Sequence, residues 1–302
     1  MKMVRALLAL ALLVPAALAI AAGDPHNVQG VLLKADPATR TIEVSCDAIP
    51  GYMDAMVMTF AVRDAKVLKN LQTGSTVRFT MVTEGNEEIA DHLEPIQVQN
   101  YEAEPTEAAR LAYLHRALDH TAAQKLIPIG GLVPNFTLTD QSNRPTQLDD
   151  FKGMVVVLSF AYARCPNPNY CFRLSNNLAQ VGRRYHARAG RGLMLLTIVI
   201  EPDQDQGQAL AHYADTWKAD WSAWRFLTGS LTDIHAIAER FGMDFWNNEG
   251  FLTHSFHTVV IDRDGRLAAN LEGNHFTADQ LGDLVGTLLD RQADPPSNGG
   301  GF

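Results

Sequence analysis

The chain has 302 residues, of which 46% are hydrophobic and 20% are charged, so it holds enough apolar residues to build the cores of globular domains. This length predicts two domains rather than one. The formal net charge of -9 argues against a nucleic acid as a partner.

The first residues predict a secretory signal peptide. Lys2 and Arg5 precede an apolar run, and Ala17 and Ala19 provide a cleavage site of small residues. The run has about 17 residues, fewer than the roughly 20 of a membrane-spanning helix. We therefore expect residues 1–22 to be removed on export, with an uncleaved membrane anchor as the alternative.

Residues 27–100 show short strands separated by polar turns. The expected strands are GVLLKAD, TIEVSC, AMVMTFAV and STVRFTMV, followed by a last strand near residues 92–98. Because no helical pattern interrupts them, these five strands predict a small antiparallel, OB-like all-β barrel.

The pattern then changes to alternating helices and strands. Residues 101–127, rich in Ala, Leu and charged residues, predict a linker helix. The runs VVVLSFAYA and LMLLTIVI are typical of strands buried on both faces, and a hairpin turning at Asp264–Gly265 precedes a last helix. We expect an α/β thioredoxin-like domain over residues 128–291 and a disordered tail over residues 292–302.

Cys165 and Cys171 lie between the first buried strand and a helix. A helix start favours thiolates, so this position suits reactive cysteines. Three interpretations remain open: a structural disulfide, a redox-active pair, or two ligands of a metal ion. Two thiolates joined by a neutral imidazole would form a soft site for Cu(I) that can also hold Cu(II). If the pair forms a disulfide, Cys46 is the third and unmatched cysteine.

The stretch GGLVPNFTLTDQSNRPTQLDDFKGMVVVLSFAYARCP, the loop VIEPDQDQ and the segment HSFHTVVIDRDGRL resemble the Sco (SenC) family, over roughly residues 128–291. This resemblance implies an exported, thioredoxin-like protein that binds copper through two cysteines and a distant histidine. It also implies a role in building the copper centre of cytochrome c oxidase, as a metallochaperone, a thiol reductant or both.

The family's histidine lies ten residues before the Asp–Gly turn, which points to His254, with His257 as the competitor. Residues three apart on a strand face opposite sides, so only one of the two can reach the thiols. Two features depart from the family. Five residues rather than three separate the cysteines, and Thr253 stands where an aspartate often supports the histidine. The chain also lacks the CxxC spacing that would indicate a simple thioredoxin-type reductase.

The segment SCDAIPGYMDAMVMTFAV contains Cys46, Met53, Met56 and Met58. Met56 and Met58 are two apart on a predicted strand, so they share one face. One interpretation makes them gap-filling residues inside the barrel. The other makes them thioether ligands of Cu(I), which do not form disulfides in an oxidising compartment.

Residues 29–98 also resemble the CusF-like periplasmic copper-binding domain, a five-stranded barrel. Met56, Met58 and Phe60 match its M-x-M-x-F pattern. Met53 falls where that domain has a capping tryptophan, and Cys46 falls one residue from its histidine. The resemblance implies a copper site at Cys46, Met53, Met56 and Met58.

Together these patterns predict a periplasmic copper metallochaperone for oxidase assembly. The alternatives are a periplasmic thiol–disulfide oxidoreductase, which would be an enzyme, and a copper-buffering protein for copper tolerance. The expected partners are copper donor and acceptor proteins, with an oxidase subunit as one acceptor, and a thiol reductant.

Overall fold

The computed structural model describes residues 25–96, 126–165, 170–248 and 251–291. The expected signal peptide, linker helix and C-terminal tail lie outside these residues, apart from the last two linker positions. Within the described part of the chain, no helix combines the length and the apolar character that crossing a bilayer requires.

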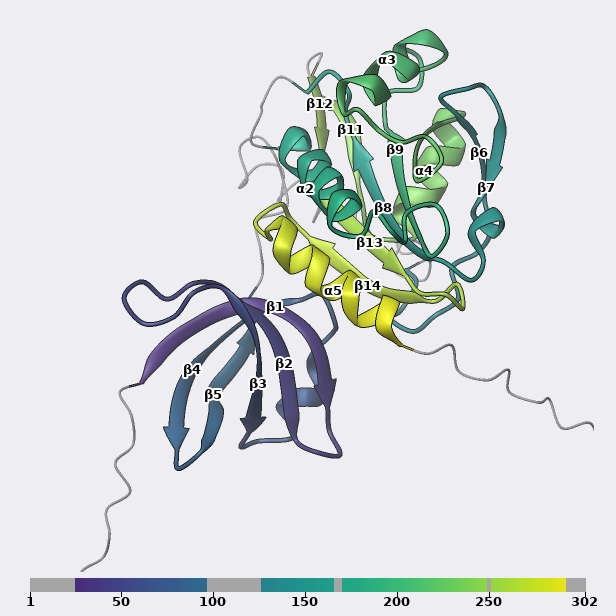
Figure 1. The fold of residues 1–302 in the computed structure, drawn as a ribbon. Coiled ribbons are helices and arrows are strands. Elements are labelled where there is room, and N and C mark those ends of the chain that lie inside the picture. Colours follow the sequence, from purple (N-terminus) through teal and green to yellow (C-terminus); the bar gives the residue numbers. More distant parts are fainter. Residues whose placement is uncertain (1–24, 97–125, 166–169, 249–250, 292–302) are drawn as a thin grey trace, which may run out of the picture.

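The N-terminal domain is a closed five-stranded barrel with strand order β1-β2-β3-β5-β4 (Figure 1), as predicted. Its elements are β1 (His26–Asp36), β2 (Thr41–Cys46), β3 (Met56–Val62), the 3-10 turn η1 (Val67–Asn70), β4 (Thr76–Glu84) and β5 (Glu87–Pro95).

Three details of the barrel prediction are wrong. Strands β3 and β5 pair in parallel, so the barrel is not wholly antiparallel. The last strand spans Glu87–Pro95 rather than residues 92–98. It starts early because Gly85 and Asn86 form a two-residue turn that pairs Glu84 with Glu87, a hairpin signal that the sequence carries. The short turn η1 also interrupts the strands.

The C-terminal domain has a seven-stranded mixed sheet, order β14-β13-β8-β9-β10-β6-β7, in the predicted thioredoxin-like arrangement. Its strands are β6 (Thr137–Asp140), β7 (Pro145–Gln147), β8 (Val155–Ala161), β9 (Leu193–Val199), β10 (Trp224–Thr228), β13 (His257–Ile261) and β14 (Leu267–Glu272), beside a separate pair, β11 (Phe245–Asn248) and β12 (Phe251–His254). Its helices are η3 (Leu148–Phe151), α2 (Cys171–Arg184), α3 (Gln208–Thr216), α4 (Leu231–Glu239) and α5 (Ala278–Asp290).

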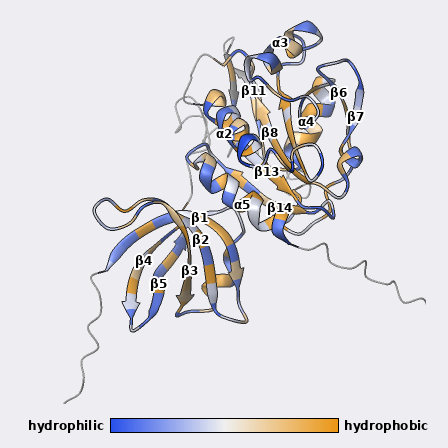
Figure 2. Cartoon of the chain, viewed as in Figure 1, coloured by the Kyte–Doolittle hydropathy of each residue, from blue (hydrophilic) through white to orange (hydrophobic). Residues whose placement is uncertain are grey.

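Both faces of the central strand β8 are covered, which explains its uninterrupted apolar sequence. Val155 and Val157 join the core under α2 and α5, whereas Val156 and Leu158 join the core under α4. Figure 2 shows these central strands as largely hydrophobic. Because β8 is buried along its whole length, the position of its C-terminal end is fixed. The segment that contains the cysteines begins just after this end.

The barrel packs directly on the second domain. Alternate residues of β1 face opposite sides, so Leu32 joins the barrel core while Val31 and Leu33 join the core that contains α5. Figure 1 shows α5 lying against β1 and β2. The two domains therefore share an apolar interface.

Candidate metal centres

The C-terminal domain brings Cys171 and His254 together. Cys171 is the first residue of α2, and His254 is the last residue of β12. The Cys171 Sγ lies 3.3 Å from the His254 Nε2, and both side chains are buried. Strand β12 pairs with β11, where Phe245 lies opposite His254, so a hairpin that was not predicted from the sequence carries the histidine.

Hydrogen bonding fixes the tautomer of His254. Its Nδ1 lies 2.9 Å from the backbone oxygen of Ser255, which can only accept a hydrogen bond. We therefore assign the proton to Nδ1, which leaves the lone pair of Nε2 directed at the Cys171 thiol. The Ser255 carbonyl thus orients the imidazole. It replaces the support that an aspartate would give at position 253, where the sequence has Thr253.

Aromatic rings cover this pair. Phe256 contacts His254 edge-to-face, with ring centroids 4.7 Å apart, and Tyr170 stacks on Phe256 at 5.5 Å. These rings leave the imidazole fully buried, so its orientation does not depend on solvent.

Cys165 is partly exposed, and its backbone N–H donates to the Tyr162 carbonyl at 3.0 Å. It contacts the same apolar core that contains Cys171. Residues 166–169, between the cysteines, lie outside the described residues. Among the residues that are described, no three His, Cys, Asp or Glu side chains already form a group that could hold a metal ion. The structure thus pairs Cys171 with His254 and places Cys165 against the same core.

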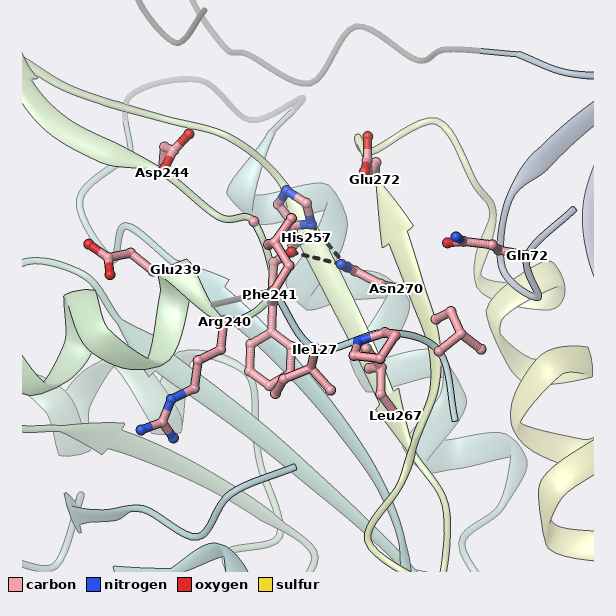
Figure 3. Close-up of a pocket in the computed structure, with 14 residues that line it drawn as sticks. Gln72, Ile127, Glu239, Arg240, Phe241, Asp244, His257, Leu267, Asn270 and Glu272 are labelled. Carbon is pink, nitrogen blue, oxygen red and sulfur yellow. Dashed lines mark hydrogen bonds between the residues drawn. The ribbon is translucent and has the colours of Figure 1, made fainter. Parts of the chain in front are cut away.

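His257, the competing histidine, faces a different region. Figure 3 shows it beside Asn270, and its Nδ1 lies 2.9 Å from the Asn270 Oδ1. Asn270 in turn donates to the Phe241 carbonyl at 2.7 Å. These groups line a pocket of about 410 Å³ that also includes Gln72 of the barrel and Ile127.

A buried carboxylate, Asp205, supports the cysteine segment and was not singled out from the sequence. Burial raises the pKa of Asp205 to about 6, with a further contribution from Glu201, while Arg164 and the backbone N–H of Ala163 oppose the shift. Arg164, next to Cys165, donates to Glu201 at 3.2 Å. The polar loop EPDQDQ after β9 was the available signal, but only the fold shows that Asp205 accepts the backbone N–H of Ala163, next to the cysteine segment.

The barrel places the other predicted residues at one end. Cys46 pairs with Met56 and Val44 pairs with Met58 across β2 and β3, so these side chains share the interior face. Met53 is held in the intervening loop by a bridge with Ile49, where the Ile49 N–H donates to the Met53 carbonyl at 2.8 Å.

These residues differ in burial. Cys46 is 1% exposed, and its Sγ lies 3.6 Å from the Val44 carbonyl, whereas Met56 is 51% exposed. Met53 and Met58 are intermediate and contact the barrel core. Burial raises the pKa of the Cys46 thiol to about 12, with a further contribution from Asp47. Met56 is too exposed to act as a core filler, and Cys46 must lose a proton to bind a metal ion.

Comparison with protein families gives two matches. The model "SCO1/SenC" matches residues 128–289, more than half of the chain. The model "Copper binding periplasmic protein CusF" matches residues 25–95. Each match covers one of the two observed domains.

Individual relatives are distant. A protein from Stutzerimonas stutzeri named "Putative copper-binding protein" is 24% identical over 60% of this chain and 89% of its own length. "Protein SCO2 homolog, mitochondrial" from Homo sapiens is 25% identical over 50% of this chain, and the chain spans only 57% of that protein's length. The crystal structure of a SCO1/SenC family lipoprotein from Bacillus anthracis aligns at 23% identity with a TM-score of 0.48, covering 53% of this chain and 96% of the other.

Proposed function

The chain belongs to the SCO1/SenC family, and we propose that it is an exported, periplasmic copper metallochaperone that serves assembly of the cytochrome c oxidase copper centre. Copper is its cargo, bound as Cu(I) at two sites. Cys165, Cys171 and His254 form the site in residues 128–291. Cys46, Met53, Met56 and Met58 form the site in residues 27–100.

The observation that carries this proposal is the contact between Cys171 and His254. The Nε2 lone pair lies 3.3 Å from the thiol sulfur, while Nδ1 is engaged by the Ser255 carbonyl. Imidazole nitrogen and thiolate sulfur are ligands that soft copper ions accept. Two donors are thus already oriented, and we assign the role of the third donor to Cys165.

The barrel offers a different donor set. Its thioethers bind Cu(I) without losing a proton and do not form disulfides. Met56 is exposed, so a copper donor protein can reach this end of the barrel directly. We assign copper capture to this site, and delivery to the site in the second domain.

The cysteine pair makes the second site dependent on redox state. Forming the Cys165–Cys171 disulfide releases two electrons and two protons to an oxidant, and it removes both thiolate ligands. A thiol reductant returns the electrons and restores the site. Copper delivery is therefore controlled by an external reductant.

A thiol–disulfide oxidoreductase is the second candidate, favoured by one observation. Cys165 is partly exposed whereas Cys171 is buried, so an external disulfide would meet Cys165 first and Cys171 could resolve the mixed disulfide. In that case the pair would reduce a target's cysteines without binding copper.

A metal titration separates the two candidates. The reduced protein should bind two equivalents of Cu(I), falling to about one after a mild oxidant and returning to two after a thiol reductant. Mixing the loaded protein with candidate acceptors, including the copper-binding domain of an oxidase subunit, should then move one equivalent. Disulfide exchange together with an unchanged copper count would support the oxidoreductase instead.

A further inference from the structure

The end of strand β2 is held by helix α5 of the other domain. The Ser45 hydroxyl donates to the Asp283 carboxylate at 2.7 Å. The Gln280 amide donates to the Ser45 carbonyl at 3.2 Å and to the Asp47 carboxylate at 2.8 Å. Cys46 lies between these two held residues.

Because side chains alternate along β2, the contact with α5 can affect the barrel site. Ser45 faces α5, whereas Cys46 faces the barrel interior opposite Met56. Hydrogen bonds at both neighbours of Cys46 restrain the strand there and so favour the position of the thiol opposite Met56.

The holding residues are themselves fixed. Gln280 is 5% exposed, and its Oε1 accepts the Thr277 backbone N–H at 2.9 Å in the cap of α5. Arg184, the last residue of α2, donates to Asp283 at 2.6 Å. Because α2 begins at Cys171, one helix of about 21 Å joins the second site to this contact.

We propose that Gln280 and Asp283 are positioning residues for the copper site of the barrel, so that the second domain sets the affinity of the first domain for copper. The inference rests on the proposed function of the barrel. Removing outer partners of metal ligands typically costs about 10–100-fold in affinity, and these residues act through the backbone of Cys46, so we expect a loss of about tenfold.

Gln280→Glu is the most informative variant. A glutamate at this position still accepts the Thr277 N–H and so preserves the cap of α5. It cannot donate to the Ser45 carbonyl, and it repels the Asp47 carboxylate. The substitution therefore breaks the contact with β2 while sparing the helix.

The measurement uses the full mature chain with Cys165→Ser and Cys171→Ser, which leaves only the barrel site. Competition with a chromogenic Cu(I) chelator gives the affinity, and the ultraviolet charge-transfer absorption of the Cu(I)–thiolate bond reports on Cys46. Gln280→Glu should lower the affinity about tenfold and weaken this absorption. Adding Asp47→Asn should recover most of both, because an asparagine amide can donate to the new carboxylate.

Gln208→Glu is the matched control. It makes the same chemical change at an exposed side chain on helix α3 of the thioredoxin-like domain, away from β2, and should leave the affinity unchanged. Thermal unfolding is recorded in parallel. A lower Tm with unchanged affinity and absorption would overturn the inference, because it would leave Gln280 a purely structural role. A background protein that binds no Cu(I) would overturn the barrel's proposed function as well, whereas binding that ignores Gln280→Glu would overturn the inference alone.

Discussion

The two candidate sites differ in what their protein surroundings have already arranged. At the thioredoxin-like site, His254 is buried, its tautomer is set by Ser255, and the thiol of Cys171 lies 3.3 Å away. At the barrel site, Met56 is half exposed, and the one cysteine is buried and protonated. The first site is oriented but depends on thiol redox state, whereas the second is accessible and contains no cysteine pair that could form a disulfide within the site.

This difference suits two steps of one process. A thioether site at an open barrel end can load in an oxidising compartment, because sulfur in methionine does not form disulfides. The proposed thiolate site, with its preoriented imidazole, can bind copper only while its cysteines are reduced.

The largest effect should come from removing the thioethers. Met56→Leu with Met58→Leu deletes two of the barrel's donors and should abolish its copper site, so the oxidised protein should bind none. Leu replaces Met with little change in volume, so Tm should change little. Titration of the oxidised protein and circular dichroism provide the two measurements. Retention of one equivalent would show that the methionines are not ligands.

His254→Ala should weaken copper binding at the thioredoxin-like site by about 100-fold or more, since it removes a ligand and not merely a supporting partner. His257→Ala is the matched control, because His257 contacts Asn270 rather than the cysteines. Its copper affinity should equal that of the wild type. Chelator competition in the Met56→Leu, Met58→Leu background isolates this site, and the reverse ranking of the two variants would transfer the ligand role to His257.

The barrel site should respond to pH. Because the Cys46 thiol has a pKa raised to about 12, copper must displace its proton, and the affinity should rise up to about tenfold per pH unit between pH 6 and 8. Cys46→Ser should flatten this slope, since thioethers carry no proton. Chelator competition at three pH values measures it. A slope that persists in Cys46→Ser would exclude Cys46 as its source.

The sequence predicted the architecture wherever one local pattern determined it. Continuous apolar runs marked β8 and β9, and the Asp264–Gly265 turn marked the β13–β14 hairpin. The cysteines and His254 were singled out by motif and by counting from the family resemblance, and their role as ligands stays a prediction. The strand pairs β6–β7 and β11–β12 were missed because each strand has only three or four residues, too few to show a periodicity.

The groups that orient the site residues could not be predicted from the sequence, for a different reason. The Ser255 carbonyl is a backbone atom that no motif encodes, and Gln280 acts on residues 233 to 235 positions away. Asp205 is buried because its loop packs against the segment that contains Ala163. Such contacts depend on tertiary structure, so a single sequence cannot reveal them.

The smallest expected effect concerns the stability of the thioredoxin-like domain alone. Asp205 has a folded-state pKa raised to about 6 from its usual value of 3.8, because burial disfavours its charge. The folded state therefore binds more protons than the unfolded state between about pH 4 and pH 6. The stability that this group contributes is present below pH 4 and is lost as pH rises through 6, by at most about 3 kcal/mol.

Asp205→Asn keeps the shape of the side chain and removes the charge. Among the described residues, the Oδ2 atom has no hydrogen-bond partner, so the new amide would be an unsatisfied buried donor and would offset part of the gain. We expect a net stabilisation of about 1 kcal/mol at pH 7 and none at pH 4. All four tryptophans, Trp217, Trp221, Trp224 and Trp246, lie in the thioredoxin-like domain, so their fluorescence during urea unfolding reports on that domain alone. A gain of equal size at both pH values would show that the effect is packing rather than charge. A loss at pH 7 would show that the Asp205 carboxylate is needed to hold the backbone at Ala163, which would make it a support of the cysteine loop.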